Sequence, residues 1–205
     1  MDKGNKPDKK TRKRALTIIL RIIIILVVIL AIHRGYMLLV TTGEYMITSN
    51  NYFDYQKRYE CSGYASAYAL RSLGVEADGV ELYKSFTDKN PDGTLAPGYL
   101  WENLRHMGYK SSLLVGSITD LKYAVRKGTP VVVLIKVKTS QPYLHYVPVV
   151  GYDKDYIYVA DSLSYLVDTE EEHYNRKIAI EDFKELWKND TFGVDNIYLT
   201  IGIKD

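Results

Sequence analysis

The stretch YQKRYECSGYASAYALRSLG, Tyr55–Gly74, holds the single cysteine of this 205-residue chain. Small and apolar residues recur at helical spacing after Cys61, and Gly74 is typical of a helix end, so the sequence predicts a helix over Cys61–Leu73. Cys61 then lies at a helix N-terminus, where the helix dipole and unpaired N–H groups favour a thiolate. A cysteine in this place is a candidate nucleophile, although a lone cysteine is more often a small buried hydrophobe.

The rest of the chain changes from helical to extended patterns. Short helical segments that end at glycine dominate as far as residue 128, and β-branched runs such as PVVVLIKV, Pro130–Val137, follow. Helices followed by antiparallel strands indicate an α+β fold. The predicted helices are 61–73, 80–86, 97–107, 119–127 and 180–187, and the predicted strands are 109–115, 130–137, 144–152, 156–161 and 196–203.

The first forty residues form a separate segment with a basic head and an apolar body. Ala15–Ile32 spans about 27 Å as a helix, close to the ~30 Å hydrocarbon core of a bilayer. This match indicates a transmembrane anchor. We therefore expect a basic cytoplasmic tail at 1–14, an anchor at 15–40, a short linker at 41–49 and one folded domain at 50–205.

Charge sets the expected orientation of this anchor. Residues 1–40 carry a net charge of +7 and residues 41–205 carry −5, so the positive-inside rule leaves the N-terminus in the cytoplasm and the domain outside the cell membrane. A cleaved signal peptide is the alternative, because a basic head before eleven apolar residues, Ile22–Ile32, also fits one. The acidic body argues against a nucleic-acid partner, which needs a basic face.

Two titratable residues belong to a predicted β-hairpin. His145 opens one strand and Asp161 ends the next. A three-residue loop pairs Tyr152 with Tyr156 and places Asp161 diagonal to His145 on one face of the sheet. A two-residue loop would separate them, and a bulge at Pro148 would change the count.

The residue types match the chemistry of a thiol acyl-transfer enzyme. An imidazole beside Cys61 would form a thiolate–imidazolium pair, and a carboxylate on the other ring nitrogen would fix its tautomer. The side-chain amide of Gln56 and the Cys61 N–H would form an oxyanion hole. No Cys/His spacing supports a zinc site, and no organic cofactor is implied.

This order of residues resembles a papain-like cysteine peptidase, and more closely the bacteriocin-processing cysteine peptidase family 39 with its stand-alone relatives. The resemblance covers roughly residues 50–203, through YQKRYECSGYASAYALRSLG, GTPVVVLIKV, HYVPVVGYDKDYIYVADS and IEDFKELW. It implies a papain-like fold in which Cys61 is the nucleophile, His145 the base and acid, Asp161 its orienting partner and Gln56 an oxyanion donor.

Two departures from the family pattern keep other functions open. Ser62 follows the cysteine where the family usually has glycine, and Gln56 stands one residue closer to Cys61 than the papain-like glutamine. We expect a membrane-anchored extracytoplasmic thiol peptidase or amidase that acts on a peptide or protein through an acyl-enzyme. The alternatives are transglutaminase-like acyl transfer with the same triad, and a non-catalytic binding or immunity module.

Specificity is expected to come from two loops, 89–98 and 162–177. The second loop is rich in glutamate and is predicted to be solvated over the sheet. The sequence pattern leaves the substrate and the oligomeric state open.

Overall fold

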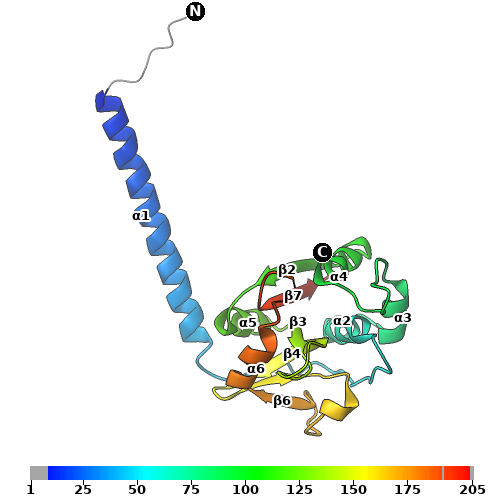
Figure 1. Ribbon diagram of the computed structural model, residues 1–205. Coiled ribbons are helices and arrows are strands. Elements are labelled where there is room, and N and C mark those ends of the chain that lie inside the picture. The colour runs from blue at the N-terminus through cyan, green and yellow to red at the C-terminus, as the bar shows by residue number, and fades with distance from the viewer. Residues whose placement is uncertain (1–8, 191, 204–205) are drawn as a thin grey trace, which may run out of the picture. The chain divides into compact units, whose positions relative to one another are not determined.

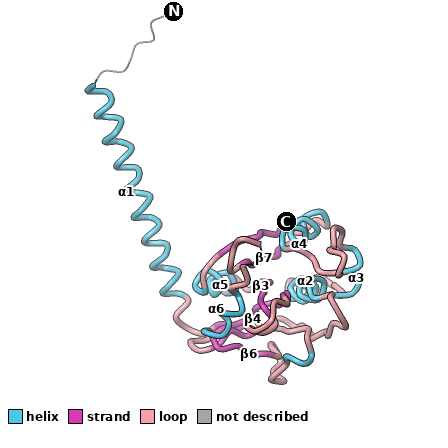
Figure 2. Tube along the Cα trace, in the orientation of Figure 1, coloured by secondary structure: helices cyan, strands magenta, loops and turns pink. Residues whose placement is uncertain are grey.

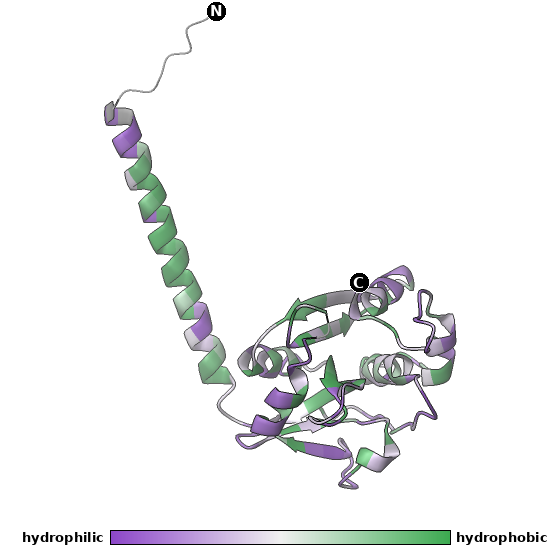
Figure 3. Ribbon diagram, viewed as in Figure 1, coloured by the Kyte–Doolittle hydropathy of each residue, from purple (hydrophilic) through white to green (hydrophobic). Residues whose placement is uncertain are grey.

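The computed structural model describes residues 9–190 and 192–203, and the chain divides into two units after Val40. The first eight residues of the predicted tail, and the last two of the predicted domain, lie outside the described part. The N-terminal unit is a single helix, α1 (Lys9–Val40), whose middle is largely hydrophobic (Figure 3).

Among the described residues, one helix is long and apolar enough to cross a membrane. This span, Arg12–Val40, lies near the N-terminus and none of its most apolar stretch is buried. A signal sequence near the N-terminus has the same length and apolar composition.

The unit from Thr41 onward has the predicted α+β fold (Figure 1). Its helices are α2 (Cys61–Ser72), α3 (Gly79–Ser85), α4 (Pro97–His106), α5 (Ile118–Val125) and α6 (Ile180–Trp187), with a 3-10 turn η1 (Ser164–Leu166). Its strands are β1 (Tyr45–Met46), β2 (Lys110–Val115), β3 (Val131–Lys136), β4 (Leu144–Tyr152), β5 (Tyr156–Val159), β6 (Arg176–Ala179) and β7 (Ile197–Gly202).

The strands form one sheet in the order β2-β7-β3-β4-β5-β6, with β1 added beside β4, and each pairing is antiparallel. Helices cover both faces of its central strands (Figure 2). Val131, Val133 and Ile135 of β3 pack in one cluster with α5 and α6, while Val132 and Leu134 pack with α2 and α4. Burial on both faces explains why β3 reads as an unbroken apolar run.

Close contact with α3 fixes the first turn of α2. A Cβ atom on Gly63 would lie 2.2 Å from the Gly79 carbonyl oxygen, and one on Gly79 would lie 2.8 Å from the Tyr64 ring. Only glycine allows backbones to approach so closely. The Cys-Ser-Gly sequence therefore places its glycine where α2 meets α3.

The predicted hairpin register is wrong at the turn. Tyr152 pairs with Ile157 rather than with Tyr156. A tight turn causes the shift, because the Asp153 carboxylate accepts hydrogen bonds from the backbone N–H groups of residues 155 and 156. This register alone would separate His145 and Asp161 onto opposite faces.

A β-bulge then restores the predicted facing. The register shifts between Val149 and Gly151, so that Val149 pairs with Val159. If this register continues two residues beyond Val159, Asp161 lies opposite Val147 and therefore on the same face of the sheet as His145, as the sequence predicted. The irregularity adjoins Pro148, whose carbonyl accepts a hydrogen bond from the residue 160 N–H at 3.0 Å. A proline within a strand is a common companion of a bulge.

The prediction of a solvated loop over 162–177 is wrong at its C-terminal end. Arg176 begins β6, which pairs with β5, and both Asn175 and Arg176 are buried. Polar side chains indicated exposure to solvent, but those of Asn175 and Arg176 form hydrogen bonds with buried Asp161 instead of with water.

We predict that Gly63→Ala destabilises the domain by about 1–3 kcal/mol, because the added methyl group overpacks the contact between α2 and α3. Gly98→Ala is the matched control, since a Cβ atom there meets nothing within 4 Å and Gly98 lies within α4. It should be neutral or slightly stabilising. Urea unfolding of the two variants measures this difference, and equal stability would contradict the packing argument.

Candidate active site

Cys61 is the first residue of α2 and is a half-buried free thiol. The N-cap residue Glu60 makes no capping hydrogen bond with its side chain, and its carboxylate instead accepts from the Arg58 N–H at 2.7 Å. The first N–H groups of a helix lack partners within the helix. The thiol therefore lies at the positive end of α2, beside backbone donors that a bound oxyanion can use.

His145 is the second residue of β4 and is 2% exposed. Its Nε2 lies 2.8 Å from Oδ1 of Asp161, and the residue lines the same cleft as Cys61. Because Nε2 faces the carboxylate, Nδ1 is the nitrogen left for the thiol. The structure thus brings together Cys61, His145 and Asp161.

The surroundings of the two buried groups favour their charged forms. Burial opposes a charged His145, but the charge and hydrogen bond of Asp161, with the hydrogen bond of Cys61, raise the pKa of His145 to about 9. Burial likewise opposes a charged Asp161. The charge and hydrogen bond of His145, the Leu163 N–H and the charge of Arg176 nevertheless lower the pKa of Asp161 to about 2.

Two residues that sequence reasoning missed hold Asp161 in place. Arg176 donates from Nη1 to Oδ2 of Asp161 at 2.8 Å. Asn175 accepts from the Asp161 N–H at 2.7 Å and donates to the Asp161 carbonyl at 2.8 Å. In β6, buried Arg176 and Ile178 flank exposed Lys177, but Arg176 and Lys177 are both basic, so the sequence shows no apolar alternation here.

Gln56 lies in the same cleft as Cys61 and His145. Its backbone N–H donates to the Ser162 carbonyl at 3.0 Å, and its side-chain oxygen accepts from the Ser162 hydroxyl at 2.8 Å. Its amide nitrogen donates one hydrogen to the Arg58 carbonyl at 2.6 Å. These bonds fix the amide with its nitrogen turned away from Ser162, and a second hydrogen remains on that nitrogen.

The cleft itself has a volume of ≈ 320 Å³. Three exposed tyrosines, Tyr59, Tyr143 and Tyr165, come to it from three separate segments. The two loops predicted to set specificity both reach it. The first contributes Asp92 and Thr94, and the second contributes Leu163 and Tyr165.

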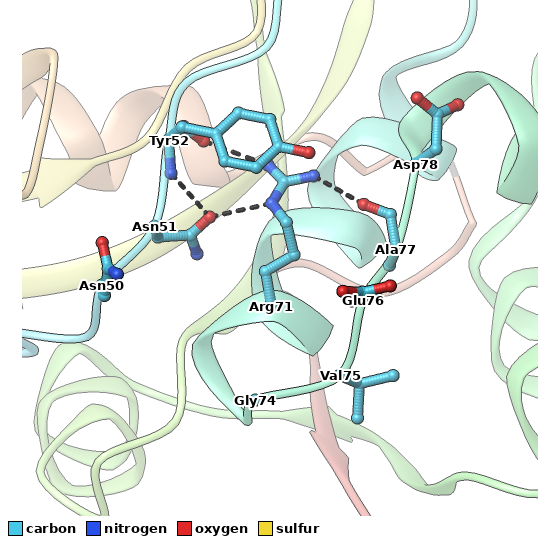
Figure 4. Close-up of a pocket in the computed structure, with 9 residues that line it drawn as sticks. All are labelled: Asn50, Asn51, Tyr52, Arg71, Gly74, Val75, Glu76, Ala77 and Asp78. Carbon is cyan, nitrogen blue, oxygen red and sulfur yellow. Dashed lines mark hydrogen bonds between the residues drawn. The ribbon is translucent and has the colours of Figure 1, made fainter.

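A larger pocket, ≈ 680 Å³, lies at the opposite end of α2 (Figure 4). Arg71 dominates it and donates to the Asn51 side chain and to the Tyr52 and Ala77 carbonyls. Arg71 also pairs with Asp54 at 3.1 Å. Ten residues of helix, about 15 Å, separate Arg71 from Cys61. This arginine fastens the segment before α2 to the helix and takes no part in the cleft.

No group of three or more His, Cys, Asp and Glu residues among residues 9–190 and 192–203 is arranged to hold a metal ion.

The sequence over residues 46–193 matches the model of the Peptidase_C39 like family. The chain belongs to this family. The suspected relation to peptidase family 39 is thereby confirmed. A comparison with curated proteins finds no match.

Solved structures of C39 peptidases share the fold. A C39-like peptidase from Bacillus anthracis matches with a TM-score of 0.57 and 20% identity, over 78% of this chain and 98% of that one. The peptidase domain of Streptococcus ComA, a bifunctional ABC transporter of a quorum-sensing pathway, matches with a TM-score of 0.58 and 15% identity, over 76% and 99%. A double glycine motif protease from an AMS/PCAT transporter, in complex with the leader peptide, has a TM-score of 0.50 and 15% identity, over 78% and 98%.

The charged pair of this C39-like domain predicts how stability depends on pH. The raised pKa of His145 gives stability that is complete below about pH 6.5 and is lost as the pH rises to about 9. The lowered pKa of Asp161 gives stability that is complete above about pH 4 and is lost as the pH falls to about 2. The free energy of unfolding should therefore be highest between these limits.

Urea unfolding of the full-length chain in detergent, followed by tryptophan fluorescence, measures this profile. His145→Gln should remove much of the loss above pH 6.5, which approaches about 1.4 kcal/mol per pH unit in the wild type. His106→Gln alters an exposed histidine of α4 and should leave the profile unchanged. Parallel profiles for wild type and His145→Gln would contradict the charged pair.

Proposed function

We propose that this chain is a membrane-anchored extracytoplasmic thiol peptidase or amidase that uses Cys61, His145 and Asp161 as its triad. The observation that carries the proposal is the 2.8 Å hydrogen bond between His145 and the Asp161 carboxylate, with His145 lining the same cleft as the thiol at the start of α2. The C39-like fold supports a cysteine-peptidase type of activity.

The geometry suggests a route for the reaction. The Cys61 thiolate attacks the substrate carbonyl carbon, and the carbonyl π electrons move to its oxygen. His145 then gives its Nδ1 proton to the leaving amine as the carbon–nitrogen bond breaks, which leaves a thioester on Cys61. Neutral His145 next removes a proton from water, which attacks the thioester and releases the acid and the thiolate.

The developing oxyanion needs donors that are fixed before the reaction. The Cys61 N–H and the second amide hydrogen of Gln56 are the candidates, since both residues line the cleft. Hydrogen bonds to Ser162 and to the Arg58 carbonyl hold the amide in place. A preorganised donor of this kind typically accounts for roughly 10²–10³ in kcat.

A peptide is the proposed substrate. The double glycine motif protease that shares the fold is in complex with a leader peptide. In this chain, Tyr59, Tyr143 and Tyr165 give the cleft aromatic walls with polar tips, a combination suited to an extended peptide. The apolar helix Arg12–Val40 supports an anchor, and the basic residues before it favour a domain outside the cell.

The alkylation rate of Cys61 as a function of pH tests this proposal. Because Cys61 is the only cysteine, iodoacetamide labelling of the full-length chain in detergent reports on this thiol alone. We predict rapid labelling already near pH 6, since the imidazolium stabilises the thiolate. His145→Ala should remove the low-pH reactivity, and His106→Ala should retain it.

Two results would count against the proposal. A wild-type profile that follows an ordinary thiol, with half-maximal labelling near pH ~8.5, would indicate that no ion pair forms. An unchanged profile in His145→Ala would indicate that the imidazole does not act on the thiol. Either result would favour a non-catalytic binding module with the same fold.

A further inference from the structure

Asp161 has two cationic partners, and the proposed reaction needs only one of them. Its side chain is fully buried, and Oδ1 accepts from His145 Nε2 and from the Leu163 N–H, each at 2.8 Å. Oδ2 accepts from Arg176 Nη1 at 2.8 Å, and the Arg176 side chain is 11% exposed. Each carboxylate oxygen thus has its own charged partner.

The main chain of Asp161 is also held, by the residue before Arg176. Asn175 forms two hydrogen bonds with the Asp161 backbone, one to the N–H and one to the carbonyl. Its own N–H donates to the Val159 carbonyl at 3.2 Å, which ties it to β5. Two consecutive residues at the start of β6 therefore fix both the backbone and the carboxylate of Asp161.

The second cation matters because the charge of His145 changes during turnover. After His145 gives its proton to the leaving amine, the imidazole is neutral and no longer balances the carboxylate. A buried carboxylate without a counter-charge takes up a proton or turns toward another donor. A protonated Asp161 would no longer stabilise the imidazolium that the next cycle requires. Arg176 stays charged throughout, because a guanidinium does not lose its proton in proteins.

We propose that Arg176 is a positioning residue of the active site, held in register by Asn175, which keeps Asp161 ionised and aimed at His145 through the whole cycle. This inference rests on the proposed thiol chemistry and adds a residue to it. Cys61 and Arg176 are the charged or titratable groups with the largest effects on the His145–Asp161 pair. Arg176 is thus the fixed positive charge of this set.

Removal of the Arg176 charge should shift the pH dependence of Cys61 reactivity in one direction. Without Arg176, Asp161 takes up a proton more easily, which weakens the imidazolium that balances the thiolate. This raises the pH at which Cys61 becomes reactive. A residue that only stabilised the fold would leave this pH unchanged.

The test measures iodoacetamide labelling of Cys61 between pH 4 and 9 in the full-length chain in detergent. Arg176→Met should raise the low-pH onset by about one pH unit, which is roughly a tenfold slower rate below the onset. Arg176→Lys should recover most of the shift. Arg71→Met is the matched control, because Arg71 is equally buried, pairs with Asp54, and lies at the other end of α2. It should keep the wild-type onset.

A double variant keeps the test valid if Arg176→Met folds poorly. Asp161→Asn leaves Arg176 buried without its anion, and removal of the remaining charge often restores stability. Asp161→Asn with Arg176→Met should therefore be more stable than Asp161→Asn alone, yet have the same labelling profile. A further shift in the double variant would show that Arg176 does not act through Asp161.

The outcomes separate this inference from the function on which it rests. A wild-type onset at low pH that Arg176→Met leaves unchanged would overturn the role of Arg176 alone. An ordinary thiol profile in the wild type, insensitive to His145→Ala, would overturn both.

Discussion

The hydrogen bond between His145 Nε2 and Asp161 Oδ1 is the contact on which the rest of the site depends, because it pairs two buried groups of opposite charge. Each partner shifts the pKa of the other toward its charged form. The bond also directs the remaining ring nitrogen to Cys61. One interaction therefore sets the protonation, the tautomer and the orientation of the imidazole.

The packing of α2 decides whether Cys61 reaches the His145–Asp161 pair. The first turn of α2 is held by the contact of Gly63 with α3, where an added methyl group would not fit. The same helix packs on the central strands of the sheet, and β4 carries His145. The fold thus presents a helix N-terminus to a strand that bears the imidazole. The nucleophilic role proposed for Cys61 depends on this arrangement.

The sequence predicted correctly those helices and strands that have strong local signals. The bounds of β4 and α6 are those predicted, and Cys61 begins its helix, because apolar periodicity and glycine stops are local properties. The hairpin register depended on a turn held by the Asp153 carboxylate and on a bulge beside Pro148, whose effects cancel. Arg176 could not be found from its surroundings in the sequence. Its partner is fifteen residues away and is brought to it only by strand pairing.

The protonation of the His145 ring tests the central interaction most directly. NMR of the full-length chain in detergent, with ring-labelled histidine assigned through His145→Gln, follows this proton between pH 4 and 10. The account predicts that His145 remains an imidazolium through neutral pH and titrates near pH 9, and that Asp161→Asn lowers this value markedly. Titration of wild-type His145 near pH 6.5, as for a solvated histidine, would contradict the charged pair and the chemistry derived from it.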